Sequence, residues 1–297
     1  QPHYIYMAEE MYRADPTKET LSKYAEQVEE TAAFMADFVT AGPAPAGSPS
    51  GKKYSLIGAT AMQESMSKDF SYNHPFELAY WRYGLSVAQQ WRERTGKGRD
   101  KQWDDIIANL APLPQTQDGI YSAGLPKGKT DGLTTFDPFD AVASGAQPVV
   151  STETFDEKCR NDHPAVLGAF GLLPACSVCC DSIATNKTLD WVMHNWNWAT
   201  TWGWDYGMTA MAAARLGQPE TALQALLTDT QKNTYLVSGH NFQTADRLRL
   251  YLPGNGALLT AIAMMCAGWD GCTRPSNPGF PQDGRWDVRW EGLQRMQ

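Results

Sequence analysis

The chain contains 297 residues, of which 42% are hydrophobic, a composition typical of a globular protein with one large core or two modest ones. Its net charge is −8, and no cluster of Lys and Arg suggests a phosphate-binding stripe, which argues against nucleic acid as a partner. The mean hydropathy is −0.43, and no apolar run approaches the ~20 residues of a membrane helix, so no membrane partner is expected.

The first part of the chain predicts two helical hairpins. Thr17 is a suitable cap for the second helix, and Pro75 stands in a first turn, where proline is favoured. The segment 41–53 is rich in Pro, Gly and Ser and predicts a surface loop, and residues 54–61 are short enough to be extended. Apolar residues at helical spacing place the helices at 4–13, 17–40, 76–94 and 100–110.

The second part of the chain begins with a long irregular loop at 111–160, which is rich in Pro, Gly, Asp and Thr. A loop of this length is usually functional or partly disordered. In the tail that follows Gly268, the run Trp286–Gly292 could form a strand, with Arg289 stacked between two tryptophans. Helices are expected at 163–173, 179–196, 205–216, 219–227 and 256–267.

Paired helices with almost no strand pattern indicate an all-α fold. About nine helices form hairpins, and long loops follow some of them, which favours a helical barrel whose loops carry the site. We therefore expect one catalytic domain spanning residues 1–297, with the architecture of an (α/α)6 toroid. Six hairpins need about three more helices, so a segment before Gln1 or another chain is expected to complete the barrel.

The six cysteines are Cys159, Cys176, Cys179, Cys180, Cys266 and Cys272. Their even number hints at disulfides, and Cys266 and Cys272 are close enough in sequence to bridge a short loop. The triplet of Cys176, Cys179 and Cys180 lacks a second pair at zinc spacing, so no metal site is predicted, and nothing indicates a cofactor. Asn186 begins a glycosylation sequon, which favours a secreted protein.

Aromatic residues point to a carbohydrate site. The chain has 11 Trp and 12 Tyr, and many of them stand beside Gly, Asn or Asp. Trp202 and Trp204 belong to such a cluster at 196–206. Amphipathic rings beside polar groups are typical of a solvent-accessible site in which the rings stack on sugar faces. Each ring alone could equally belong to the core of a helical domain.

Two carboxylates are candidates for acid–base chemistry. Glu64 lies in a polar loop before a helix, where burial would raise its pKa enough for a general acid; the alternative is a solvated surface residue. Asp205 stands at a helix start, where the helix dipole favours a carboxylate as a cap. The alternative role for Asp205 is substrate binding or general base catalysis.

A third group of residues precedes the last helix. His240, Asn241, Tyr251 and Asn255 supply imidazole, amide and phenol groups that hydrogen-bond sugar hydroxyls, although His240 could equally be structural. A Gly-rich phosphate loop, a His-Glu-x-x-His motif and a Gly-x-Ser-x-Gly motif are all missing from the sequence, so kinase, zinc protease and serine hydrolase activities lack support.

Several motifs resemble those of six-hairpin glycosidase-like proteins, which are similar to glycoside hydrolase families 65 and 95. The resemblance covers nearly the whole chain except the 111–160 loop and the cysteine-rich patch. The motifs are Gln63-Glu64, Asn73-x-Pro75-Phe76-Glu77-Leu78-x-Tyr80-Trp81, Trp202-Gly203-Trp204-Asp205, Asn233-Thr234-Tyr235-Leu236, Gly239-His240-Asn241 and Leu250-Tyr251-Leu252-Pro253-Gly254-Asn255-Gly256.

This resemblance implies hydrolysis of a glycosidic bond of an oligosaccharide with inversion. Glu64 matches the general acid of these families. In family 95 an Asp that assists the base often stands two residues before the Asn that Asn255 resembles, but here this position is Pro253, so Asp205 becomes the leading candidate for the base. Inversion requires the two carboxyl groups to be roughly 6.5–9.5 Å apart.

Two other functions stay open. A phosphorylase of the family 65 kind would need a basic or Ser/Thr-rich anion site near Asn255, and the sequence has no Lys beside that residue. A non-catalytic carbohydrate-binding or scaffold protein would keep the barrel and lose the base, and Pro253 favours this alternative.

Overall fold

A computed structural model describes residues 1–44, 51–58, 72–122, 138–145, 159–172, 174, 180–274 and 276–297. This part of the chain is mostly helical with a few short strands, so the expected all-α class is confirmed. The chain divides into two compact units, which comprise residues 1–60, 67–114 and 124–149, and residues 61–66, 115–123 and 150–297. No helix among the described residues is long and apolar enough to cross a membrane.

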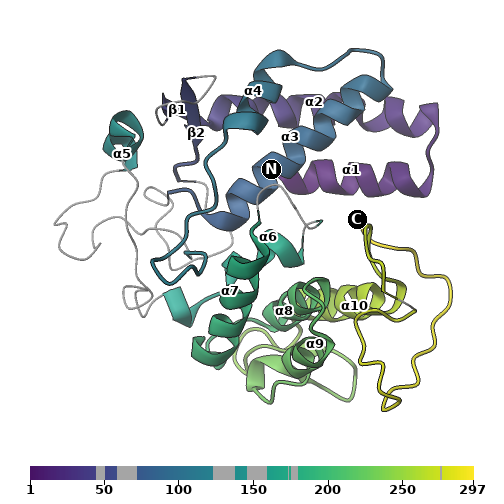
Figure 1. Ribbon diagram of the computed structural model, residues 1–297. Helices are drawn as coiled ribbons and strands as arrows, with labels where there is room; N and C mark the ends of the chain where they lie inside the picture. The colour runs from purple at the N-terminus through teal and green to yellow at the C-terminus, as the bar shows by residue number, and fades with distance from the viewer. Residues whose placement is uncertain are drawn as a thin grey trace. The chain divides into compact units, whose positions relative to one another are not determined.

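The first unit contains both predicted hairpins (Figure 1). The hydroxyl of Thr17 accepts a hydrogen bond from the Thr20 N–H at 3.2 Å, which confirms the predicted cap. Pro75 opens its helix as expected. The helices of this unit are α1 (Pro2–Ala14), α2 (Lys18–Phe38), α3 (Pro75–Arg94), α4 (Lys101–Asn109) and α5 (Pro138–Ser144), and the last of them lies inside the segment predicted as a loop.

Helices α1, α2 and α3 pack against one another, and apolar side chains from all three fill the core of the first unit. Trp91 is buried there, and its indole N–H donates to the Glu9 carboxylate at 2.6 Å. Arg94 donates to the same carboxylate at 2.5 and 3.0 Å. These bonds offset the large desolvation cost of burying a charged carboxylate.

A short hairpin of β1 (Thr40–Pro43) and β2 (Lys52–Ser55) lies in the region predicted as a loop and the start of an extended segment. After β2 the backbone of Leu56 exchanges hydrogen bonds with Asn73: its N–H donates to Oδ1 at 2.8 Å, and its carbonyl accepts from the Asn73 N–H at 2.8 Å. Asn73 has a φ of 49°, a left-handed conformation that asparagine tolerates better than most residues. Asn73 therefore fixes the chain where it enters α3.

The second unit contains the predicted helices of the later part of the chain. The helix expected at 163–173 is shorter and interrupted, because a 3-10 turn, η3, precedes α6. Helix α10 begins one turn earlier than predicted, since Pro253 is accommodated in the first turn. The elements are η2 (Cys159–Asn161), η3 (Ala165–Leu167), α6 (Gly168–Gly171), α7 (Ser182–Asn195), α8 (Gly203–Arg215), α9 (Pro219–Leu226), η4 (Gln231–Asn233), β3 (Thr234–Tyr235), β4 (Asn241–Phe242) and α10 (Leu252–Ala267).

Helix α8 is the centre of the second unit and packs against α6, α9 and α10. Small side chains allow the helix backbones to approach closely. A Cβ atom at Gly207 would lie 2.5 Å from the Ala257 carbonyl oxygen on α10, and one at Gly171 would lie 2.8 Å from the Met208 carbonyl oxygen on α8. These contacts explain why the sequence of α8 is rich in alanine and glycine rather than in large apolar residues.

The predicted strand at Trp286–Gly292 is wrong. This segment is irregular in the structure, and no strand among the described residues pairs with it. Arg289 does not stack between the two tryptophans but pairs with Asp287 at 2.8 Å, and Trp286 and Trp290 are each 42% exposed. The tail is held to the unit at its end instead, where Arg215 donates to the Gln297 carbonyl at 2.7 Å.

The suggested bridge between Cys266 and Cys272 is not formed, and both residues are free thiols. Cys266 is buried in the last turn of α10. Cys176 and Cys179 lie outside the described residues.

On α7 the amide of Asn186 donates to the Ser182 carbonyl and accepts from Gln218, so glycosylation of the folded chain would disrupt these bonds.

Candidate functional site

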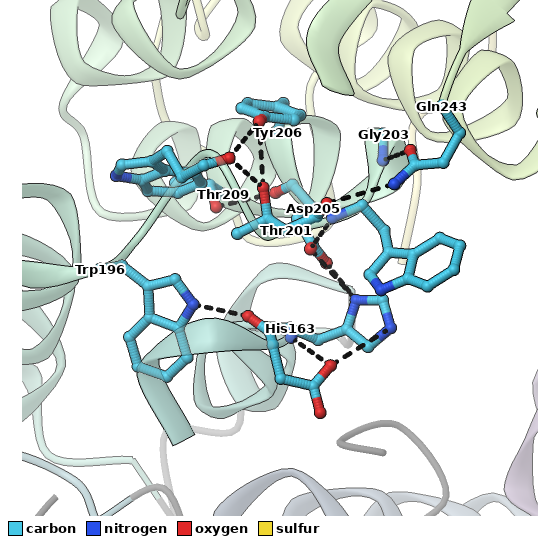
Figure 2. Close-up of polar contacts among 11 residues, drawn as sticks. His163, Trp196, Thr201, Gly203, Asp205, Tyr206, Thr209 and Gln243 are labelled. Carbon is cyan, nitrogen blue, oxygen red and sulfur yellow. Dashed lines mark hydrogen bonds and ion pairs between the residues drawn. The ribbon is translucent and has the colours of Figure 1, made fainter. Parts of the chain in front are cut away.

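The candidate site lies in the second unit, where Asp205 and His163 form a buried pair at the start of α8 (Figure 2). The two oxygens of Asp205 are 2.9 and 3.1 Å from Nδ1 of His163. One of them also accepts a hydrogen bond from the Trp202 N–H at 2.8 Å, which caps the helix. The capping role considered for Asp205 is therefore confirmed, and the carboxylate has a second role that the sequence did not reveal.

Burial raises the pKa of Asp205, because its side chain has no exposed area and a buried carboxylate loses its hydration. The hydrogen bond and charge of His163 and the Trp202 N–H act in the opposite direction. Both oxygens of Asp205 are hydrogen-bonded, and the side chain is not accessible to solvent. Any part of Asp205 in proton transfer would therefore pass through His163.

His163 has a second carboxylate at the other end of its ring. Nε2 lies 3.8 Å from Oδ1 of Asp162, and the same oxygen accepts the His163 backbone N–H at 2.7 Å. Trp196 fixes this segment by donating its indole N–H to the Asp162 carbonyl at 2.6 Å (Figure 2). A histidine with a carboxylate beside each ring nitrogen can pass a proton between two groups.

Two half-exposed aromatic rings adjoin the pair, and a third lies against one of them. The ring of His163 lies 4.6 Å from that of Trp204 and 5.9 Å from that of Trp202, measured between centroids. Trp202 in turn lies 5.6 Å from Tyr251. We call Trp202, Trp204 and Tyr251 the aromatic platform. Rings that are partly buried and partly exposed to solvent offer apolar faces to a ligand while their polar edges stay hydrated.

Gln243 and Tyr206 hold the turn that leads into α8. The side chain of Gln243 accepts from the Gly203 N–H at 2.9 Å and donates to the Thr201 carbonyl at 3.2 Å. The phenol of Tyr206 is hydrogen-bonded to the hydroxyl of Thr201 at 3.0 Å (Figure 2). Because these partners are buried, their hydrogen bonds stabilise the backbone conformation that carries Trp202.

Asn241 is a structural residue rather than one that faces a ligand. It is completely buried, and its amide nitrogen donates to the carbonyls of Lys232 and Thr234 at 3.1 and 3.2 Å. Its side-chain oxygen has no hydrogen-bond partner in the described part of the chain and lies against Gly203 and Gly254, where Cβ atoms would approach it to 2.0 and 2.4 Å. Asn241 therefore fixes the starts of α8 and α10, which carry the platform.

Asn255 anchors the β3–β4 hairpin and uses both ends of its amide to do so. Its oxygen accepts from the Asn241 N–H at 2.9 Å, and its nitrogen donates to the Gly239 carbonyl at 2.7 Å. His240 is exposed in the same loop, where Nδ1 lies 3.1 Å from the Ser238 hydroxyl. The structure thus places Asn241 and Asn255 in the framework, whereas His240 is exposed and Tyr251 belongs to the aromatic platform.

Of the two predicted catalytic carboxylates, Asp205 lies at the site and Glu64 falls outside the described residues. The sequence analysis missed His163 and Asp162. A signal was present, because two adjacent titratable residues directly before a Pro and an apolar run are unusual at the start of a buried segment. No group of three or more residues able to hold a metal ion occurs in the described part of the chain.

Comparison with known proteins found no matching family model and no matching curated protein. The arrangement itself combines a carboxylate–imidazole–carboxylate series with an aromatic surface. Such a combination can transfer protons and can stack on a flat, partly apolar ligand.

Proposed function

We propose that the protein binds an oligosaccharide and hydrolyses one of its glycosidic bonds with inversion. The observation that supports this proposal is the buried Asp205–His163 pair beside the half-exposed rings of Trp202 and Trp204, which Tyr251 extends through its contact with Trp202. Aromatic rings stack on sugar faces, and positioned acids and bases cleave the bond between sugars. An (α/α)6 toroid of helical hairpins is the architecture that we propose for the whole domain.

Inversion needs one group that gives a proton and one that takes a proton. In our proposal Glu64 protonates the glycosidic oxygen as the bond to the anomeric carbon breaks. A water molecule attacks that carbon from the opposite face and transfers its proton to the His163–Asp162 pair. Asp205 is then a positioning residue, because it holds Nδ1 of His163 and leaves Nε2 toward Asp162.

The test is hydrolysis of a glycan panel, followed by detection of new reducing ends and by NMR of the product anomer. Glu64→Gln and His163→Gln should lower kcat by about 10²–10⁴-fold while ligand binding persists. Trp202→Ala should weaken binding, and the matched control Trp286→Ala, at an exposed ring of the tail, should change neither quantity. Full turnover in His163→Gln would refute the assigned role.

A non-catalytic carbohydrate-binding protein is the second candidate. It is favoured by the complete burial of Asp205 and by Pro253 at the position where a carboxylate was expected. This function predicts glycan binding that depends on Trp202, with no turnover by the wild-type chain on any glycan. The same panel therefore separates the two functions.

A further inference from the structure

We propose that Lys232 selects a sugar unit with a negative charge, such as the carboxylate of a uronic acid, at the aromatic platform. The inference rests on the carbohydrate binding proposed above. Lys232 belongs to the short 3-10 turn η4, and its Nζ lies 6.0 Å from the centroid of the Trp202 ring. An ammonium group at the edge of a stacking surface can reach a charged substituent of the sugar that stacks there.

The backbone that carries Lys232 is held firmly. Its carbonyl accepts a hydrogen bond from the buried amide of Asn241 at 3.1 Å. The next residue, Asn233, donates to the carbonyls of Leu226 and Thr228 at 2.9 and 3.0 Å. A fixed backbone gives the long side chain of Lys232 a defined range, so less freedom is lost when its ammonium group binds a ligand.

The charge of Lys232 is not neutralised within the site. Among the described residues no carboxylate lies within the 4.0 Å ion-pair distance of its Nζ, whereas the half-buried Arg94 is paired with Glu9. Asp205, the buried carboxylate behind Trp202, is engaged by His163. The three N–H donors of the ammonium group therefore stay accessible to a carboxylate ligand, which accepts charge-assisted hydrogen bonds.

The overall charge of the protein makes this local cation more important. A net charge of −8 repels acidic glycans, but salt screens that repulsion beyond about 8 Å. Recognition of an acidic sugar must then come from a cation in direct contact with it. A neutral hydroxyl in the same place would gain a weaker hydrogen bond, so Lys232 would favour the acid.

The test measures the binding of three probes to the full chain by calorimetry. The probes are a glucuronic-acid-terminated trisaccharide, its methyl ester and the glucose-terminated counterpart. The wild type should bind the acid about 10- to 100-fold more tightly than the ester. Lys232→Gln should erase this difference and Lys232→Arg should retain it. The matched control Arg289→Gln removes an equal charge from the exposed tail and should have no effect.

Equal binding of acid and ester by the wild type, or an unchanged preference in Lys232→Gln, would overturn the inference. In either case, binding of the glucose-terminated probe that Trp202→Ala abolishes would leave the proposed function standing while the inference fails. If none of the three probes binds, both fail. Full competition by millimolar inorganic phosphate would also overturn the assignment to a sugar, because the site would then accept any oxyanion.

Discussion

Replacing Gly254 by alanine should destabilise the second unit, whereas the same replacement at Gly256 should stabilise it. Both residues lie in the first half of α10. A Cβ atom at position 254 would lie 2.4 Å from Oδ1 of Asn241 and 2.6 Å from its Cγ, but a Cβ atom at position 256 would meet nothing within 4 Å. The pair thus compares one chemical change in two packing environments of a single helix.

The magnitudes follow from the surroundings of Asn241. This side chain is completely buried and donates two hydrogen bonds, so it cannot move away from a new methyl group without weakening them. Overpacking costs about 1–3 kcal/mol and each weakened bond up to about 1 kcal/mol, against a gain of about 1 kcal/mol in helix propensity. We expect a net loss of about 2 kcal/mol for Gly254→Ala, and a gain of about 0.5–1 kcal/mol for Gly256→Ala.

Urea unfolding of the full chain, followed by circular dichroism, measures both free energies of unfolding. Because a chain of two units need not unfold in one step, amide hydrogen exchange in α10 should be recorded in parallel. Exchange in this helix should become faster in Gly254→Ala and slower in Gly256→Ala. The reasoning would be refuted if Gly254→Ala were as stable as the wild type, or if both variants lost the same stability.

Three further changes test other parts of the structure. Burial lowers the pKa of His74 from 6.5 to about 3. Below pH 6.5 the unfolded chain therefore binds a proton that the folded chain does not bind. The free energy of unfolding that His74 contributes above that pH is lost as the pH falls toward 3. In urea titrations the free energy of unfolding should fall by about 3 kcal/mol between neutral pH and pH 4.5. His74→Asn can still cap α3 and should remove this pH dependence. An unchanged acid dependence in His74→Asn would show that another group causes the loss. Asp205→Ala should destabilise the second unit by about 3 kcal/mol in thermal melts, since it removes a helix cap and the partner of a buried imidazole, and Asp205→Asn should lose less. Trp91→Phe should cost about 1–2 kcal/mol by urea unfolding, because Glu9 loses a buried donor; a neutral effect would show that Arg94 alone satisfies that carboxylate.

Helix positions were largely predictable because their signals are local. The cap at Thr17 and the first-turn proline at Pro75 act on residues within one turn, so the sequence alone contains the relevant contacts. The hairpin of β1 and β2 was missed because its residues are Pro- and Gly-rich and its pairing joins residues that are distant in sequence, such as Thr40 and Ser55. Helix α5 was missed because seven residues are too few for a periodic pattern to emerge.

The site was only partly predictable, because its contacts are distant in sequence. The aromatic cluster around Trp202 could be recognised because its composition is visible in a short window, and the structure places the Trp202 ring near His163 and Tyr251. The partner of Asp205, His163, stands 42 positions earlier, and no local pattern joins them. Asn241 was predicted to bind sugar because of its amide group. In the structure its amide nitrogen donates to two backbone carbonyls, and its oxygen packs against two glycines.

The carboxylate of Asp205 caps the start of α8 and is also hydrogen-bonded to the imidazole of His163. Selection for folding alone would therefore retain this aspartate in a related protein that lacks the proposed hydrolytic activity. Its presence in a related sequence would be a poor marker of turnover, whereas the loss of the imidazole opposite it, with the aspartate kept, would be the informative pattern.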